Sequence, residues 1–171
     1  MKKILKKAAI VVIAMVTMNV AAQAQEKGDM AVGANVVFGS GDNFSNYGIG
    51  AKFQYNVLDP LRLEANFTYF LEKDLISMWD FSVNAHWLFP VADKLTVYPL
   101  AGLGMLGTSV DLGEFGEYFG GSASDTEFGF NLGGGIDFKL TDKLILNAEV
   151  KYKLGSDWNR LLLSAGIAYR F

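Results

Sequence analysis

Hydrophobic and polar residues alternate along most of this chain. About eight segments carry apolar side chains at every second position, with polar or small residues between them. A period of two is typical of a β-strand that has one apolar and one polar face. The apolar rows run over residues 30–38, 47–57, 61–71, 79–89, 95–105, 128–140, 144–154 and 161–171. The pattern therefore predicts an all-β protein with eight antiparallel strands.

Alternation alone does not say which face points outward. A soluble lipocalin-like barrel keeps its apolar face inside, whereas an outer-membrane barrel turns that face toward lipid. Glycine recurs in the polar rows, and small residues suit a cramped interior better than a wet exterior. Tyr, Trp and Phe gather near the ends of the apolar rows, as in the two aromatic girdles of a membrane barrel. Both features favour an apolar exterior.

The predicted connections alternate between short and long. Tight turns are expected at 58–60, 91–93 and 141–142, and longer loops at 39–46, 72–77, 107–126 and 155–159. Short periplasmic turns and longer outer loops are typical of outer-membrane barrels. Eleven residues at about 3.3 Å each, tilted near 40°, rise roughly 28 Å, close to the apolar band of about 25 Å. We therefore predict an eight-stranded, antiparallel, up-and-down transmembrane β-barrel.

The first residues have the features of a secretory signal peptide. Four lysines precede an apolar core, and Ala22-Gln23-Ala24 has the A-x-A form of a cleavage site. The core is about 15 residues long, shorter than the roughly 20 that a spanning helix requires. We expect residues 1–24 to be a cleaved signal peptide and residues 25–171 to form the barrel.

Composition excludes several classes of function. The 171 residues include no Cys, so thiolate metal sites, disulfides and lipid-modified cysteines are excluded. Fifteen basic residues stand against 18 acidic ones, which leaves no electrostatic footprint for nucleic-acid binding. We predict no cofactor and no metal.

Two stretches resemble a known family. The C-terminal residues 161–171, LLLSAGIAYRF, look like the closing strand of a Gram-negative outer-membrane barrel, and 98–104, YPLAGLG, resembles a strand of the small porin-like group. That group includes outer-membrane protein X and the membrane half of outer-membrane protein A. The resemblance implies a bacterial outer-membrane location beside lipid and lipopolysaccharide. It also implies recognition by periplasmic chaperones and by the barrel-assembly machinery through Tyr169 and Phe171.

Pro99 departs from the usual composition of a strand, because proline removes a backbone donor from the ladder. We therefore expect a bulge there that could change which face of the strand points outward.

An eight-stranded barrel is just wide enough for its own side chains, so its polar groups must pair or hold water. Counting about the turns places Gln54 opposite Glu64, Asn56 opposite Arg62 and Asp137 opposite Asn147. We predict an interior network drawn from Lys52, Arg62, Glu64, Asp80, His86, Asp137, Glu149, Lys151 and Arg170. This network is either a plug that stiffens the barrel or a narrow conduction path.

Catalysis receives little support. His86 is the single histidine and could act as a general base, but it lacks the His-x-Ser pair of outer-membrane lipid A deacylases. The position also falls near the turn end, whereas barrel enzymes carry their catalytic groups near the outer rim. We predict no catalytic residues.

The longest loop carries aromatic residues among glycines and acids. Phe115, Tyr118 and Phe119 are candidates for contact with an extracellular ligand. We expect a structural or interaction role in the envelope. The first alternative is a narrow porin for small solutes or ions, and the second is a lipid-modifying enzyme.

Overall fold

The computed structural model describes residues 27–41, 45–73, 76–110, 123–155 and 159–171. The predicted signal peptide and the aromatic loop residues Phe115, Tyr118 and Phe119 lie outside these ranges. The described chain forms nine strand segments: β1 (Met30–Gly41), β2 (Ser45–Leu58), β3 (Leu61–Lys73), β4 (Ile76–Trp87), β5 (Phe89–Ala92), β6 (Leu95–Val110), β7 (Ala123–Lys139), β8 (Leu144–Gly155) and β9 (Asn159–Arg170). Among these residues no helix has the length and apolarity of a membrane span.

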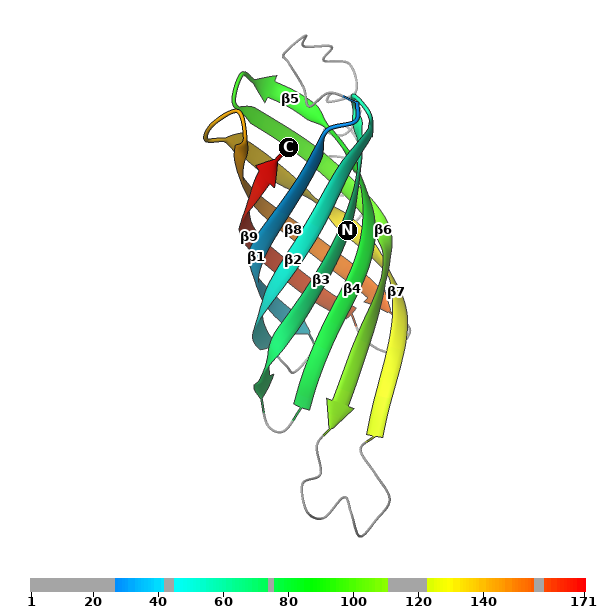
Figure 1. Cartoon of the computed structure of the whole chain (residues 1–171). Helices are drawn as coiled ribbons and strands as arrows, with labels where there is room; N and C mark the ends of the chain where they lie inside the picture. The colour runs from blue at the N-terminus through cyan, green and yellow to red at the C-terminus, as the bar shows by residue number, and fades with distance from the viewer. Residues whose placement is uncertain (1–26, 42–44, 74–75, 111–122, 156–158) are drawn as a thin grey trace, which may run out of the picture.

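The sheet closes on itself (Figure 1). Sequential strands pair antiparallel, and β1 pairs with β9 from Ala31↔Arg170 to Gly41↔Arg160. β4 and β5 are two parts of one barrel strand, because the pairing His86↔Leu100 with β6 continues in the same register as Phe89↔Val97. The protein is thus a closed eight-stranded antiparallel barrel, and the predicted fold is confirmed.

The expected bulge at Pro99 is absent, so that prediction is wrong. The pairing of β6 with β7 runs through Pro99↔Gly134 without a register shift, and Pro99 stays on the exposed face. The irregularity lies in the neighbouring strand, where pairing is interrupted between β4 and β5 at Leu88. The register places Trp87 opposite Pro99, and Pro99 has no amide hydrogen to donate to it. One backbone hydrogen bond of the ladder is therefore missing, but no extra residue is inserted to form a bulge.

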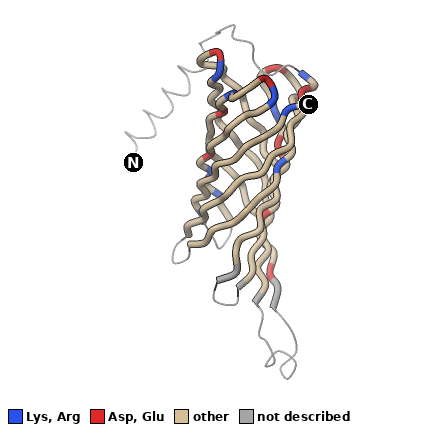
Figure 2. Tube along the Cα trace, turned by 60° about the vertical axis from the view of Figure 1, so that its left-hand side comes forward, with Lys and Arg blue, Asp and Glu red and all other residues tan. Residues whose placement is uncertain are grey.

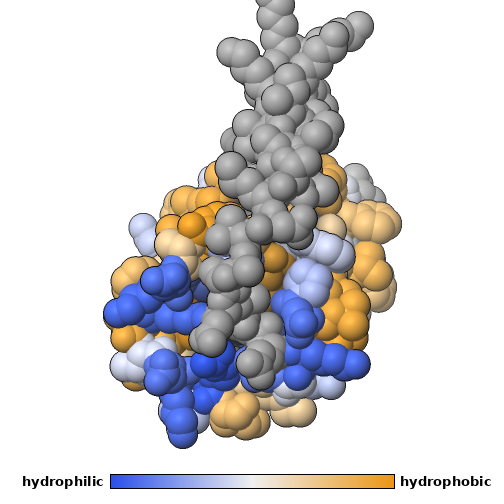
Figure 3. Space-filling view, turned by 90° about the horizontal axis from the view of Figure 1, so that it is seen from above, coloured by the Kyte–Doolittle hydropathy of each residue, from blue (hydrophilic) through white to orange (hydrophobic). Residues whose placement is uncertain are grey.

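The barrel has two distinct ends. The short connections between β2 and β3, β5 and β6, and β7 and β8 lie beside the C-terminus at the upper end in Figure 1, called here the turn end. The opposite end is called the loop end. In Figure 3, which looks onto the turn end, hydrophilic residues crowd the end face and hydrophobic residues appear at its margin.

Side chains of the strands alternate between the two faces of the wall, with a few exceptions at glycines. Phe128 is 70% exposed and Val36 63%, whereas Arg62 on the other face is fully buried. The expected apolar rows therefore face outward. Aromatic pairs lie toward the loop end of this exterior, with Phe38 and Tyr47 ring centroids 5.1 Å apart and Phe67 stacked on Trp79 at 6.2 Å.

Candidate functional site: the polar interior of the barrel

The interior of the barrel holds most of the residues that the sequence singled out. Eight of the nine members of the predicted network are buried inside: Lys52, Arg62, Glu64, Asp80, His86, Asp137, Glu149 and Lys151. Figure 2 shows charged positions both along the strands and at the turn end. Arg170 does not join the others. It lies at the turn-end rim, where its Nη1 is 3.2 Å from Asp29 Oδ2 and its Nη2 donates to the Asp142 carbonyl at 2.6 Å.

Arg62 is the centre of the turn-end half of this network. It extends from β3 across the barrel to Asp137 on β7, with 2.6 Å between Nη1 and Oδ2. Its Nε and Nη2 lie 3.2 and 3.0 Å from His86 Nδ1. Its Cζ stands 4.7 Å from the centre of the Tyr98 ring. One guanidinium therefore connects β3, β4, β6 and β7.

Lys52 connects β2, β3 and β8. Its ammonium group lies 3.5 Å from Glu64 Oε2 on β3 and 3.3 Å from Glu149 Oε1 on β8. It also donates to Asn147 Oδ1 at 2.7 Å. Tyr98 donates its hydroxyl hydrogen to Glu149 Oε1 at 2.9 Å. Buried charges of opposite sign are thus matched across the lumen, as burial in a low-dielectric wall requires.

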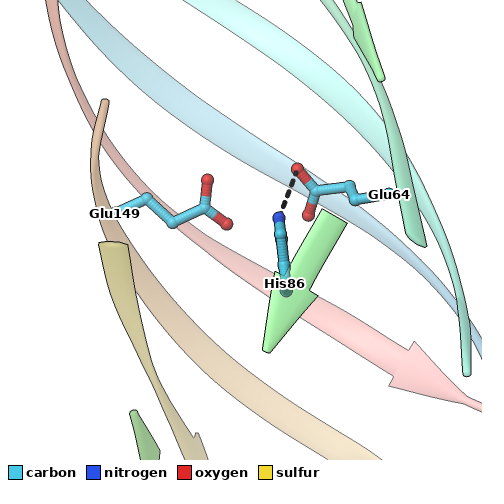
Figure 4. Close-up of side chains that lie close together, drawn as sticks. All are labelled: Glu64, His86 and Glu149. Atoms are coloured by element: carbon cyan, nitrogen blue, oxygen red, sulfur yellow. Dashed lines mark ion pairs between the residues drawn. The ribbon is translucent and has the colours of Figure 1, made fainter. Parts of the chain in front are cut away.

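His86 lies within the same cluster (Figure 4). Its ring stacks on Tyr98 with centroids 4.6 Å apart and planes at 9°. Because a guanidinium can only donate, the contacts from Arg62 fix Nδ1 as an acceptor and leave the proton on Nε2. Nε2 points toward Glu64 Oε1 at 4.0 Å, and neither atom has a hydrogen-bond partner among the described residues. His86 consequently presents a donor, not a free basic nitrogen, to the cluster.

Glu64, His86 and Glu149 offer ligand atoms within 4.8 Å of one another. Two features oppose a divalent ion there. The Lys52 ammonium already lies between the two carboxylates. A metal on His86 Nε2 would also need a proton on Nδ1, which would face the donors of Arg62. The arrangement suits an internal ion-pair network better than a metal centre.

The loop-end half combines a second polar group with apolar residues. Lys153 forms an ion pair with Asp80, which also accepts a hydrogen bond from Ser82 Oγ at 2.6 Å. Arg160 Nη2 donates to Asn46 Oδ1 at 2.5 Å, and its Cζ stands 4.7 Å from the Phe70 ring centre. An apolar cluster fills the space beside them: Val37, Phe70, Met78, Leu106 and Leu162.

The interior is tightly filled. A cavity lined by Lys151, Asp80 and Glu149, among others, has a volume of about 10 Å³, which is room for about one water molecule. Glycines make the packing possible where large side chains meet the wall. A Cβ at Gly135, for example, would lie 2.6 Å from the Tyr98 hydroxyl. The described interior therefore resembles a packed core of polar groups.

Sequence reasoning missed three members of this interior. Tyr98, Lys153 and Arg160 are 2, 3 and 2% exposed and make some of its most extensive contacts. The period-two pattern contained the signal for each, since all three fall on the same face as their buried neighbours. Strand register can be counted from the sequence, and it predicts which residues lie beside one another on neighbouring strands. The sequence does not show which partner a long side chain reaches on the far side of the lumen.

Closed antiparallel strands, an apolar exterior and a charged interior together define the class of outer-membrane β-barrels. The chain matches the family described as "Outer membrane protein beta-barrel domain" over residues 8–171 and belongs to it. It is therefore a β-barrel protein of the bacterial outer membrane.

Solved structures share this fold. The N-terminal β-barrel domain of Pseudomonas aeruginosa OprF is 17% identical over 86% of this chain and 100% of that chain, with a TM-score of 0.67. Ail, the attachment invasion locus protein of Yersinia pestis, is 22% identical over 85% and 99% of the two chains, with a TM-score of 0.61. Neisserial surface protein A is 20% identical over 84% and 96%, with a TM-score of 0.64. No curated protein matches the chain.

Proposed function

We propose that this protein is a non-enzymatic structural and interaction component of the outer membrane. Its barrel is stiffened by the interior plug and displays the loop end to the exterior. The turn end, where β1 begins and β9 ends, faces the periplasm in this proposal. The observation that carries it is a linked set of buried groups across the lumen. Arg62 pairs with Asp137 and Lys52 pairs with Glu149, and Tyr98 joins the two pairs, because Arg62 stands over its ring and its hydroxyl donates to Glu149.

The runner-up is a narrow porin, which the row of ionisable interior groups favours. The variant Glu64→Gln separates the two functions, because Glu64 accepts from Gln54 at 2.8 Å and lies 3.5 Å from Lys52. For a plug, we expect the free energy of unfolding to fall by about 3 kcal/mol while bilayer conductance stays near the baseline. Unchanged stability together with an altered single-channel conductance would contradict the plug and favour a conduction path.

The displayed surface is proposed to bind a partner outside the cell. In one of the similar structures, Ail of Yersinia pestis is in complex with the heparin analogue sucrose octasulfate. The long loop of this chain instead carries Asp111, Glu114 and Glu117 beside its aromatic residues, which disfavours a polyanion as its partner. Aromatic side chains at Phe115, Tyr118 and Phe119 are the proposed anchors.

A cell-binding assay tests this role directly. The triple variant Phe115→Ser, Tyr118→Ser and Phe119→Ser should lose most binding to host or neighbouring cells, while its heat-modifiable gel migration stays that of the unmodified barrel. Full retention of binding by the folded variant would remove the loop aromatics from the proposal.

A further inference from the structure

The lipid-facing surface has a furrow of about 950 Å³. Its floor includes four alanines, Ala34, Ala51, Ala148 and Ala165, beside larger residues such as Val36 and Ile49. The strand register places Ala34 beside Ala51 and Ala148 beside Ala165. Larger side chains form its two walls: Phe67 and Tyr69 on β3, and Ile136 and Phe138 on β7. The furrow is thus a depression between two walls of bulky side chains.

The furrow crosses the apolar band obliquely. Two ladder rows follow it, one from Phe67 through Ala51 and Ala34 and the other from Tyr69 through Ile49 and Val36. Both continue over β9 and β8 to the wall on β7. Phe138 lies one residue from the end of β7, next to the turn end. A flexible hydrocarbon chain fits this shape, because a void beside the wall forfeits van der Waals contacts that such a chain restores.

A charged hollow adjoins the turn end of the furrow. It has a volume of about 750 Å³, and its lining includes four basic residues, three acidic residues and two apolar ones: Lys94, Lys139, Lys143, Arg170, Asp29, Asp93, Asp142, Leu140 and Phe171. Asp29 pairs with Arg170. Lys143 Nζ stands 5.8 Å from the centre of the Tyr169 ring, at the aromatic level of the exterior. Lys94 and Lys143 form no ion pair with a carboxylate in the described chain.

The two features are continuous along the chain. Phe138 of the furrow and Leu140 of the hollow lie two residues apart on the outer face of the same chain segment. Ile167 of the furrow likewise lies two residues before Tyr169, whose ring Lys143 of the hollow covers. Basic clusters beside a membrane-spanning surface attract anionic head groups, each lysine contributing electrostatic attraction. The geometry points to one occupant: an anionic phospholipid with an acyl chain in the alanine-floored furrow and its phosphate group beside Lys143 and Lys94. The assignment of this lipid to the periplasmic leaflet rests on the proposed orientation of the barrel. The assignment of its chemical class does not depend on that orientation.

Native mass spectrometry, which measures the lipid that stays bound to the protein, tests this proposal. The protein is refolded into nanodiscs that contain equal amounts of phosphatidylcholine and phosphatidylglycerol and is then released for measurement. We expect phosphatidylglycerol to be retained over phosphatidylcholine by about fivefold, the factor that one lysine contributes at a membrane surface. The double variant Ala148→Leu and Ala165→Leu fills the furrow and should lose the retained lipid. Lys143→Glu should keep acyl-chain retention but remove the preference for phosphatidylglycerol.

The matched control is Ala85→Leu with Ala101→Leu. These two alanines pair across β4 and β6 on the outer face, outside the furrow. This variant should retain lipid like the unmodified protein, and heat-modifiable migration confirms that all variants are folded. Equal retention of the two lipids by the unmodified protein would overturn the proposal, as would undiminished retention by the furrow-filling variant. A dimer in micelles that becomes a monomer when the furrow is filled would assign the furrow to a second copy of the chain instead.

Discussion

At the residue scale, Arg62 shows how a single side chain organises the interior. It is fully buried and contacts Asp137, His86 and Tyr98, which lie on three other strands. A guanidinium presents five donors in one plane, so it can serve several partners at once. A lysine in this place would supply the positive charge but not the planar set of donors.

Arg62→Met should therefore destabilise the barrel strongly. Removing one partner of a buried ion pair leaves Asp137 as an uncompensated charge, and the expected loss is about 3–5 kcal/mol in the free energy of unfolding. Denaturant unfolding in lipid vesicles, followed by tryptophan fluorescence, measures the change. Arg170→Met is the matched control at the rim, where the expected loss is below about 1 kcal/mol. Similar losses for both variants would show that position in the lumen does not matter.

At the element scale, the strand that contains Pro99 illustrates what sequence reasoning can and cannot supply. Alternation located all eight barrel strands, but it ended two of them too early: residues 107–110 of β6 and 123–126 of β7, expected to be loop, are paired strand. Hairpin counting gave Gln54↔Glu64 and Asp137↔Asn147, because these pairs follow from the period and from turn length. The pattern could not show how the sheet would accommodate the missing amide donor of Pro99. The structure does so by an interruption of pairing in the neighbouring strand. The pattern also left the reach of Arg160 and Lys153 across the lumen unassigned, since such contacts depend on the curvature of the closed sheet.

Pro99→Val should restore the missing donor opposite Trp87. The new amide can complete the pairing of β4 with β6, and a β-branched residue suits an exposed strand position. We expect the free energy of unfolding to rise by about 1 kcal/mol, the net contribution of one hydrogen bond. Hydrogen exchange of the amides around Leu88 should slow in parallel. Faster exchange there would mean that proline sets the local twist of the strand.

At the scale of the whole molecule, closure depends on the seam between the first and last strands. The Phe171 amide donates to the Met30 carbonyl at 3.0 Å, and Arg170 pairs with Asp29 across the same seam. Tyr169 and Phe171, the predicted recognition signal, lie on the exposed face of this region. Recognition and closure would then use adjacent residues.

Phe171→Ala separates the two roles. Loss of the aromatic ring leaves the backbone bond to Met30 intact, so refolding of the purified chain in detergent should be nearly unchanged. In cells, we expect the membrane-inserted fraction to fall several-fold, with precursor accumulating in the periplasm. Quantitative immunoblots of outer-membrane fractions provide the measurement. Equal defects in cells and in detergent would assign the residue to closure alone.

The ion pairs of the lumen join residues far apart in the chain: 75 positions separate Arg62 from Asp137, and 97 separate Lys52 from Glu149. Neither contact can form while the sheet is still open. An incompletely curled intermediate would present bare ammonium and carboxylate groups to hydrocarbon, where an unsatisfied charge is very unfavourable. We therefore expect insertion to be all-or-none: the chain enters the bilayer as a nearly closed barrel, or stays at the interface until its first and last strands pair.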